Sequence, residues 1–198
     1  MGKGSSGMVK ILVQNLIGNK QPPAPAVKPI NALPFTSLGV AENIIRDKRI
    51  ENMIVFENTS QPAISAYSGN AHAVSIPAGN YSGKTLTHNH PNRNWGGTLS
   101  RQDIRLLSST NAKSLRAVGR RGEGGYIITQ SRNSNVKGFA NRVAKDYNML
   151  ESKMIQAGNS AAQRGLSSRG IRQATVGVLH SYYKQTASQY GLTYTRNK

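Results

Sequence analysis

The chain has 198 residues, of which 37% are hydrophobic, so it is long enough for one ordinary domain with one core. It contains no cysteine, which excludes disulfide bridges and thiolate metal sites, and no apolar run is long enough to span a bilayer. The 26 Lys and Arg residues outnumber the 8 Asp and Glu residues, and the net charge of +18 indicates an anionic partner or a strongly solvated surface.

The first 36 residues are predicted to form a flexible arm. Residues 1–8 are rich in glycine and serine, and residues 21–29 are rich in proline, which favours an extended, semi-rigid backbone. The start of the chain lacks the apolar segment of a signal peptide. Residues 1–36 are therefore expected to be a linker, or an arm that lies across a partner.

A mixed α/β core is predicted to follow. Apolar residues at helical spacing indicate a short helix over residues 37–47. Hydrophobic runs separated by turn residues predict four strands, at residues 50–56, 63–67, 71–76 and 84–87.

Two of the four histidines, His88 and His90, stand two positions apart at the end of the last of these strands. Alternate residues of a strand point to the same face, so both imidazoles can reach one ion. Pro91 ends the strand, and Ser100 then begins a helix as its N-cap, with Asp103 in the first turn. Two imidazoles and one carboxylate, with a fourth position left to water, are the ligand set of a catalytic zinc site.

The run from His88-Asn-His-Pro to Ser-Arg-Gln-Asp103 resembles the JAMM (JAB/MPN) metallopeptidase motif. It is most similar to the RadC-like, phage minor-head-protein and polymorphic-toxin-associated branches of that family. The resemblance covers roughly residues 46–130 and implies a JAB/MPN-like fold for residues 37–130, with a mixed sheet and flanking helices. Twelve residues separate the second histidine from the aspartate, two more than in the family pattern, and the surplus lies in the loop at residues 92–95.

The resemblance also implies a role for each site residue. The two histidines and Asp103 would bind Zn²⁺, and Ser100 would support the oxyanion or the water on the metal. A glutamate on an early strand would be the general acid/base, taking a proton from water and giving it to the leaving amine. Glu51 opens the first predicted strand and is the candidate for this role. Glu57, at the far end of that strand, is the alternative, and a solvated surface glutamate is the other interpretation of Glu51.

Beyond the site, residues 103–109 are predicted to be helical. Residues 114–119 and 126–129 are expected to pair as a hairpin, with Arg120 and Arg121 exposed at its tip.

Residues 131–198 are predicted to form a basic helical extension. Apolar stripes indicate two helices, over residues 136–156 and 167–189, packed as a hairpin on the sheet or on another subunit. The segment contains 11 basic and 2 acidic side chains, so its outer faces are expected to bind a polyanion, DNA or RNA. Its tyrosines can either stack on bases or belong to the core; they are Tyr182, Tyr183, Tyr190 and Tyr194.

Three functions from different classes are consistent with these features. The first is a zinc-dependent peptidase or isopeptidase of JAMM type, in which water activated on zinc attacks an amide bond of a protein or peptide, in a phage or toxin setting. The second is a basic phage structural or DNA-associated cargo protein, with a non-catalytic JAMM-like fold and phage head proteins as partners. The third is a metal-dependent nuclease toxin. The expected location is the host cytoplasm or the phage virion, with secretion as an effector as the alternative.

Overall fold

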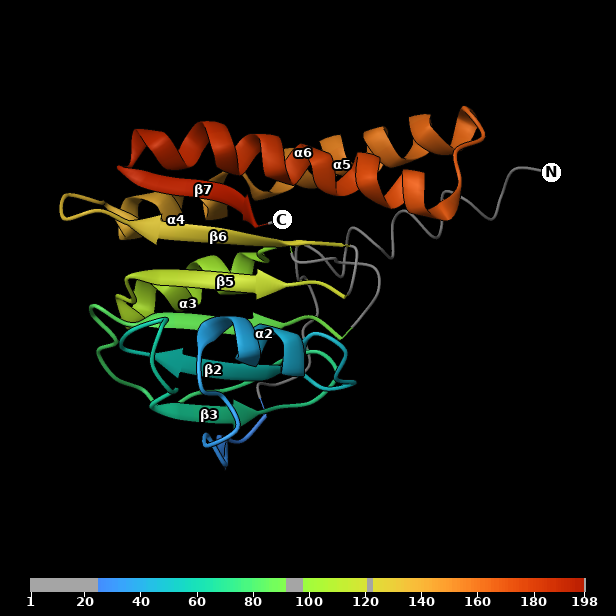
Figure 1. The fold of residues 1–198 in the computed structure, drawn as a ribbon. Coiled ribbons are helices and arrows are strands. Elements are labelled where there is room, and N and C mark those ends of the chain that lie inside the picture. Colours follow the sequence, from blue (N-terminus) through green and yellow to red (C-terminus); the bar gives the residue numbers. More distant parts are fainter. Residues whose placement is uncertain (1–24, 92–97, 121–122, 198) are drawn as a thin grey trace.

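The computed structural model describes residues 25–91, 98–120 and 123–197, which form a mixed α/β protein (Figure 1). In this part of the chain, seven strands make one mixed sheet in the order β1-β3-β2-β4-β5-β6-β7. The strands are β1 (Lys28–Ile30), β2 (Asn52–Phe56), β3 (Ser65–Ser68), β4 (Thr85–Asn89), β5 (Ser114–Val118), β6 (Gly125–Gln130) and β7 (Leu192–Asn197). The same residues contain five helices, α2 (Leu38–Ile45), α3 (Arg101–Thr110), α4 (Val136–Lys145), α5 (Tyr147–Gln163) and α6 (Ser168–Gln189). Strands β4 and β5 are parallel, and the other neighbouring pairs are antiparallel.

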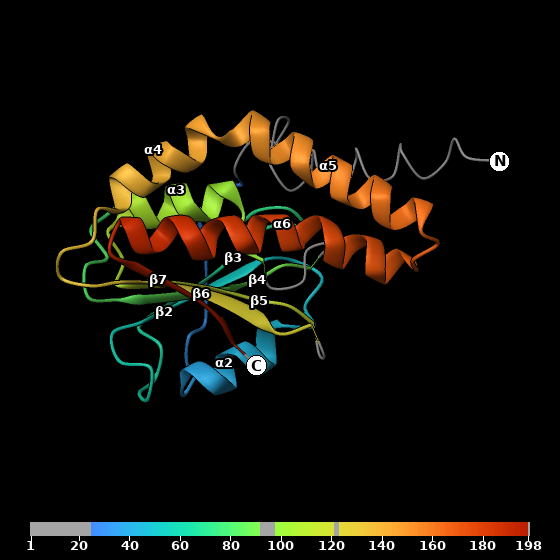
Figure 2. The same cartoon turned by 90° about the horizontal axis from the view of Figure 1, so that it is seen from above.

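Helices cover both faces of the sheet. Helix α2 lies on one face, and α3, α4, α5 and α6 lie on the other (Figure 2). Alternate residues of the central strand β2 supply both cores: Met53 and Val55 belong to the cluster shared with α3–α6, and Ile54 and Phe56 belong to the smaller cluster with α2. Every residue of β2 is buried, as expected for a strand that is covered on both sides.

The C-terminal residues complete the sheet. Strand β7 pairs with β6 at the sheet edge, and side chains from α4, α5, α6 and β7 join the same cluster as Met53. Tyr183 and Tyr194 are only 1% and 9% exposed, so they belong to the core and do not offer stacking surfaces. Residues 131–198 therefore share one core with residues 37–130.

Most of the predicted elements are confirmed, with ends shifted by a few residues; they are the helices at 37–47, 103–109 and 167–189 and the strands at 50–56, 63–67, 84–87, 114–119 and 126–129. Residues 71–76, however, are not a strand. The Asn70 side chain accepts hydrogen bonds from the amides of His72 (2.8 Å) and Ala73 (3.0 Å). These bonds fold the segment into a turn and remove the amides from any ladder.

The helix predicted over residues 136–156 is broken at Asp146. The backbone there leaves helical geometry, with a ψ angle of 3°. The Asp146 carboxylate accepts hydrogen bonds from Arg142 (2.6 Å) and from the Tyr182 hydroxyl on α6 (2.8 Å). The break therefore coincides with a contact to a helix that is distant in sequence.

Some predictions fall on residues outside the described ranges, namely most of the N-terminal arm, the loop at residues 92–95, and Arg121. Residues 28–30 of the predicted arm form the edge strand β1. Among the helices of the described residues, none has an apolar stretch of the length needed to cross a membrane.

A buried ion pair attaches α2 to the sheet. The Glu42 carboxylate accepts hydrogen bonds from the Arg116 guanidinium on β5 (Nη2 to Oε2, 3.2 Å) and from the Thr87 hydroxyl on β4 (3.1 Å). Glu42 is 4% exposed, and a carboxylate is costly to bury without a cation.

Replacing Arg116 by methionine should lower the free energy of unfolding by about 3 kcal/mol, because the Glu42 carboxylate stays buried without its cation. Lys84→Met is the matched control, since Lys84 pairs with the exposed Glu57 (2.7 Å) and its loss should change stability little. Urea denaturation of both variants measures the difference. Equal effects would show that Arg116 does not stabilise the buried carboxylate.

Candidate metal centre

Strand β4 brings the two histidines to one face of the sheet. His88 stands opposite Met53 of β2, so both side chains point to the face that α3 covers. The His90 amide donates to the Val118 carbonyl (3.4 Å), which continues the strand geometry past Asn89. Both imidazoles are therefore directed toward α3, as the His-x-His spacing predicts.

Helix α3 supplies the carboxylate. It begins near the C-terminal end of β4, because it follows β4 in the chain and connects it to the parallel strand β5. Ser100 Oγ accepts a hydrogen bond from the Asp103 amide (3.2 Å), and the Asp103 carboxylate accepts one from the Ser100 amide (2.6 Å). This capping box fixes the Asp103 side chain in the first turn of the helix.

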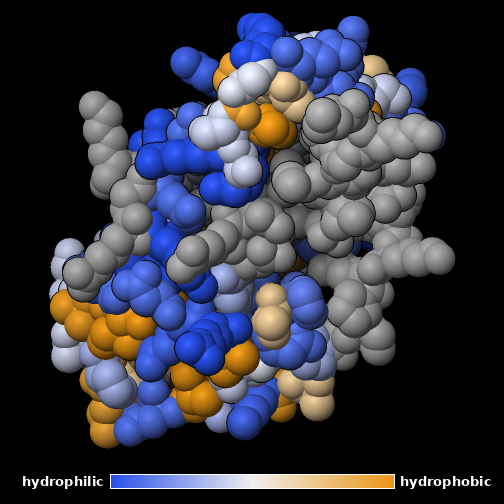
Figure 3. Space-filling view, turned by 90° about the vertical axis from the view of Figure 1, so that its right-hand side faces the viewer, coloured by the Kyte–Doolittle hydropathy of each residue, from blue (hydrophilic) through white to orange (hydrophobic). Residues whose placement is uncertain are grey.

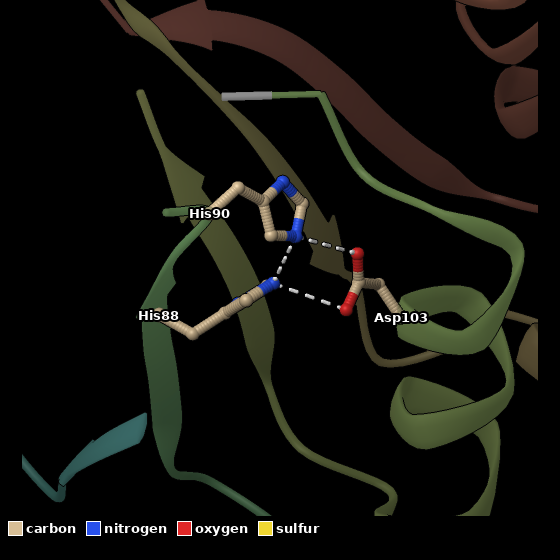
Figure 4. Close-up of side chains that lie close together, drawn as sticks. All are labelled: His88, His90 and Asp103. Atoms are coloured by element: carbon tan, nitrogen blue, oxygen red, sulfur yellow. Dashed lines mark hydrogen bonds and ion pairs between the residues drawn. The ribbon is translucent and has the colours of Figure 1, made fainter. Parts of the chain in front are cut away.

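The three side chains meet with their polar atoms close together (Figure 4). Nε2 of His88 lies 3.0 Å from Nε2 of His90 and 3.1 Å from Oδ1 of Asp103, and Nε2 of His90 lies 3.5 Å from Oδ2. All three residues are buried. Ligand atoms around a tetrahedral zinc ion are separated by ~3.3 Å. The three residues can therefore hold one metal ion.

The long connection between the second histidine and the aspartate does not prevent this convergence. Both of its ends are fixed: Arg120 donates to the Pro91 carbonyl (3.1 Å), and the buried Thr98 hydrogen-bonds His180 on α6 (3.2 Å). The contact with Pro91 leaves Arg120 half-buried, which corrects the prediction that it is exposed at a hairpin tip.

The histidines control the charge of Asp103. Burial alone would raise the pKa of its carboxyl, but the imidazoles of His88 and His90 outweigh burial and hold the pKa well below its usual range. Asp103 is therefore ionised at neutral pH and can bind a cation without first losing a proton.

Glu51 lies beside the three ligands in the same cavity, which has a volume of about 350 Å³. It stands two positions before Met53, so it occupies the face of the sheet that carries the histidines. Burial raises the pKa of Glu51 to about 7, opposed by the charge of His90 and reinforced by that of Asp103. A carboxyl that titrates near neutral pH is suited to general acid–base chemistry.

Of the other two predicted site residues, Ser100 lies at the cavity and Glu57 does not. Ser100 lines the cavity, with its hydroxyl oxygen engaged as the N-cap of α3. Glu57 is exposed beyond the far end of β2 and pairs with Lys84, so the structure does not bring it to the site.

Several further cavity residues carry no motif in the sequence. His72 reaches the cavity from the turn after β3, a position that follows from the Asn70 hydrogen bonds. The others stand at the i, i+3, i+4 and i+7 positions of one helix face, a periodicity that is readable once α3 is located; they are Gln102, Arg105, Leu106 and Ser109.

Comparisons of the chain with protein-family models, with curated proteins and with solved structures find no match. Its function is therefore inferred from the ligand set and the neighbouring carboxyl.

The geometry predicts about one divalent metal ion per chain, lost in Asp103→Asn because an amide lacks the charge that the ion needs. Asp146→Asn is the matched control, since Asp146 is also a buried aspartate but contacts Arg142 and Tyr182 instead of the cavity. Metal content would be measured by mass spectrometry after zinc loading and gel filtration. Metal retained by Asp103→Asn, or absent from the parent chain, would contradict the site.

Proposed function

We propose that the protein is a zinc-dependent peptidase or isopeptidase of JAMM type, built on a JAB/MPN-like fold. The observation that carries the proposal is the convergence of His88, His90 and Asp103 beside the partly buried Glu51 in one cavity. The order of these residues along the chain also supports it, because the carboxyl precedes the histidines and Ser100 precedes the aspartate, as the motif resemblance implies.

Zinc fits this ligand set better than the harder cations do. Magnesium and calcium are bound mainly through oxygen, whereas two imidazoles with one carboxylate suit zinc. Three protein ligands leave one place in a four-coordinate shell, as in catalytic sites. A bound zinc ion supplies Lewis acidity, which polarises an amide carbonyl and makes water a nucleophile at neutral pH.

Residues of the chain would provide the proton transfers. Glu51 accepts a proton from water on a carboxylate oxygen and gives it to the leaving nitrogen, and its pKa of about 7 suits both steps. Ser100 Oγ accepts from the Asp103 amide, so its hydroxyl hydrogen can donate toward the negative charge on the carbonyl oxygen. Met53 and Leu106 line the cavity and limit the water around the reacting atoms.

The substrate would be an amide bond of a protein or peptide, including the lysine-linked isopeptide form. A phage head protein or a host protein fits the branches that the motif resembles. The corresponding location is the phage virion or the host cytoplasm, with a secreted effector as the alternative.

Glu51→Gln should keep its zinc and lose hydrolysis by roughly 10²–10⁴-fold, because glutamine has the same size but cannot carry the proton. Glu57→Gln is the matched control, since Glu57 lies outside the cavity. Zinc-loaded protein would be incubated with a proteome-derived peptide mixture and with isopeptide-linked substrates, and new termini would be identified by mass spectrometry.

If the parent protein produces no new termini, the peptidase assignment fails. If Glu51→Gln cleaves at the parent's rate, the metal centre is not contradicted, but a group other than Glu51 is the general base.

The C-terminal hairpin favours a second function, the binding of a polyanion. Residues 152–189 contain no Asp or Glu. Helices α5 and α6 pack along one another and extend past the ends of the strands (Figures 1 and 2). Arg164 and Arg169 are exposed near the turn between the helices, Arg172 is partly exposed, and none of the three forms an ion pair within the described residues.

This surface fits a nucleic-acid duplex better than a single strand. Hydrophilic residues dominate the top of Figure 3, where the hairpin lies. Single strands are usually bound by exposed aromatic rings, but Tyr183 and Tyr194 are buried in the core. Tyr182 and Tyr190 are partly buried and pack against the same core. Guanidinium groups that form no ion pair within the described residues suit the phosphates of duplex DNA. This function corresponds to a DNA-associated cargo protein.

Changing Arg164, Arg169 and Arg172 together to glutamine should weaken binding to a fluorescent DNA duplex. The slope of log K against log salt concentration should become shallower by about 2–3, because each lost phosphate contact reduces the slope by about 0.9. The matched control changes three exposed basic residues near α2 and β1, Lys28, Lys48 and Arg49. Fluorescence anisotropy at several salt concentrations gives both slopes. An unchanged slope would refute the role of the hairpin, and zinc-dependent loss of the duplex would favour the nuclease.

A further inference from the structure

A hydrogen bond links the C-terminal helix α6 to the segment that carries the carboxylate ligand. Thr98 Oγ1 lies 3.2 Å from Nε2 of His180, a residue 82 positions later in the sequence. Thr98 is 1% exposed and Leu99 is fully buried, so this part of the chain lies inside the protein. The contact fixes the backbone two residues before the N-cap of α3.

His180 is held by two strands of the sheet. Its ring stacks on Tyr126 of β6, with ring centroids 3.7 Å apart and 15° between the planes. Its Nδ1 lies 2.7 Å from the hydroxyl of Tyr194 on β7. These contacts fix both the plane and the rotation of the imidazole.

A neutral imidazole donates one hydrogen bond from one ring nitrogen and accepts one at the other. Burial, aided by the charge of Arg196, lowers the pKa of His180 to about 4, so the ring is neutral at neutral pH. The hydroxyls of Tyr194 and Thr98 can each donate or accept, so either tautomer of the neutral ring can make both hydrogen bonds.

The link continues from Thr98 to the metal ligand. The Ser100 amide donates to Oδ2 of Asp103 (2.6 Å), which is the oxygen nearest His90 (3.5 Å). Ser100 Oγ also accepts from the Asp103 amide (3.2 Å). Ser100 follows Thr98 by two residues, so the hydrogen bond of Thr98 lies close in the chain to both groups that hold Asp103.

We propose that His180 is a positioning residue for the metal centre. Through Thr98 it holds the N-cap of α3, and with it the Asp103 carboxylate, where that group meets the two imidazoles. The inference rests on the metal site of the proposed function and does not depend on peptidase activity. It gives β6, β7 and α6 a part in the site, although these elements contribute no ligand.

The test compares zinc affinity in Thr98→Val, which keeps the size and shape of the side chain, and in His180→Phe, which keeps an aromatic ring; both changes remove the hydrogen bond. Each should weaken zinc binding about 10-fold or more, as loss of an outer-shell partner does. The double variant should be no weaker than the weaker single variant, because both changes break one link. Competition with a chromophoric chelator measures the dissociation constants.

Thr175→Val is the matched control. Thr175 is also buried and lies on α6, but its hydroxyl donates to the Ile171 carbonyl of the same helix (2.9 Å). It should bind zinc as the parent does. Unchanged affinity in Thr98→Val and His180→Phe, or an equal loss in Thr175→Val, would overturn the proposal.

A measurement on metal-free protein separates this inference from the metal site itself. Amide hydrogen exchange at Asp103 should be faster in Thr98→Val and His180→Phe than in the parent and Thr175→Val, because the amide is protected by the cap that Thr98 holds. A parent without zinc affinity would refute the metal centre. Unchanged exchange at Asp103 would refute the positioning role whether or not the metal binds.

Discussion

A carboxylate buried against two imidazoles is the interaction on which the site depends. Asp103 stays ionised in the interior because His88 and His90 offset the cost of burying its charge. Two local backbone features position these side chains. Strand β4 fixes the direction of the histidines, and the capping box fixes the aspartate at the start of α3. The length of the chain between them is therefore secondary, and a connection of twelve residues still brings the ligands together.

The C-terminal third of the chain belongs to the same structural unit as the site. Strand β7 extends the sheet, and Tyr183 of α6 packs in the core beneath α3 and α4. Burial raises the pKa of Tyr183, and the negative charge of Asp103 adds to the shift. Helix α6 therefore lies close enough to Asp103 for the two side chains to interact electrostatically. A chain that ended after β6 would lose this packing and the contacts of His180, and would leave α3 supported on one side only.

Local patterns made the ligands and most elements predictable from the sequence. The His-x-His spacing and the Ser-x-x-Asp cap each fix the direction of their side chains through local backbone geometry. Both can therefore be predicted without knowledge of tertiary contacts. The turn at Asn70, the break at Asp146 and the pairing of β7 depend on one side chain or on a distant partner, which periodicity does not reveal. The position of Glu51 along the chain made it a candidate, but its burial beside Asp103 is visible only in the structure.

Because no known family or structure matches the chain, its function has to be argued from the site. The fold alone would not identify a function, since one fold can carry many. The chemistry proposed for the cavity needs few residues, and the described residues that line it run from Glu51 to Ser109. Among the described residues, the basic hairpin, residues 152–189, contributes none of them, so the proposed metal chemistry and the proposed polyanion binding would use different residues. Helix α6 is their common element: it carries Arg169 and Arg172 in its first two turns and His180 further along. A partner on the hairpin and an ion in the cavity would thus be connected through one rigid helix.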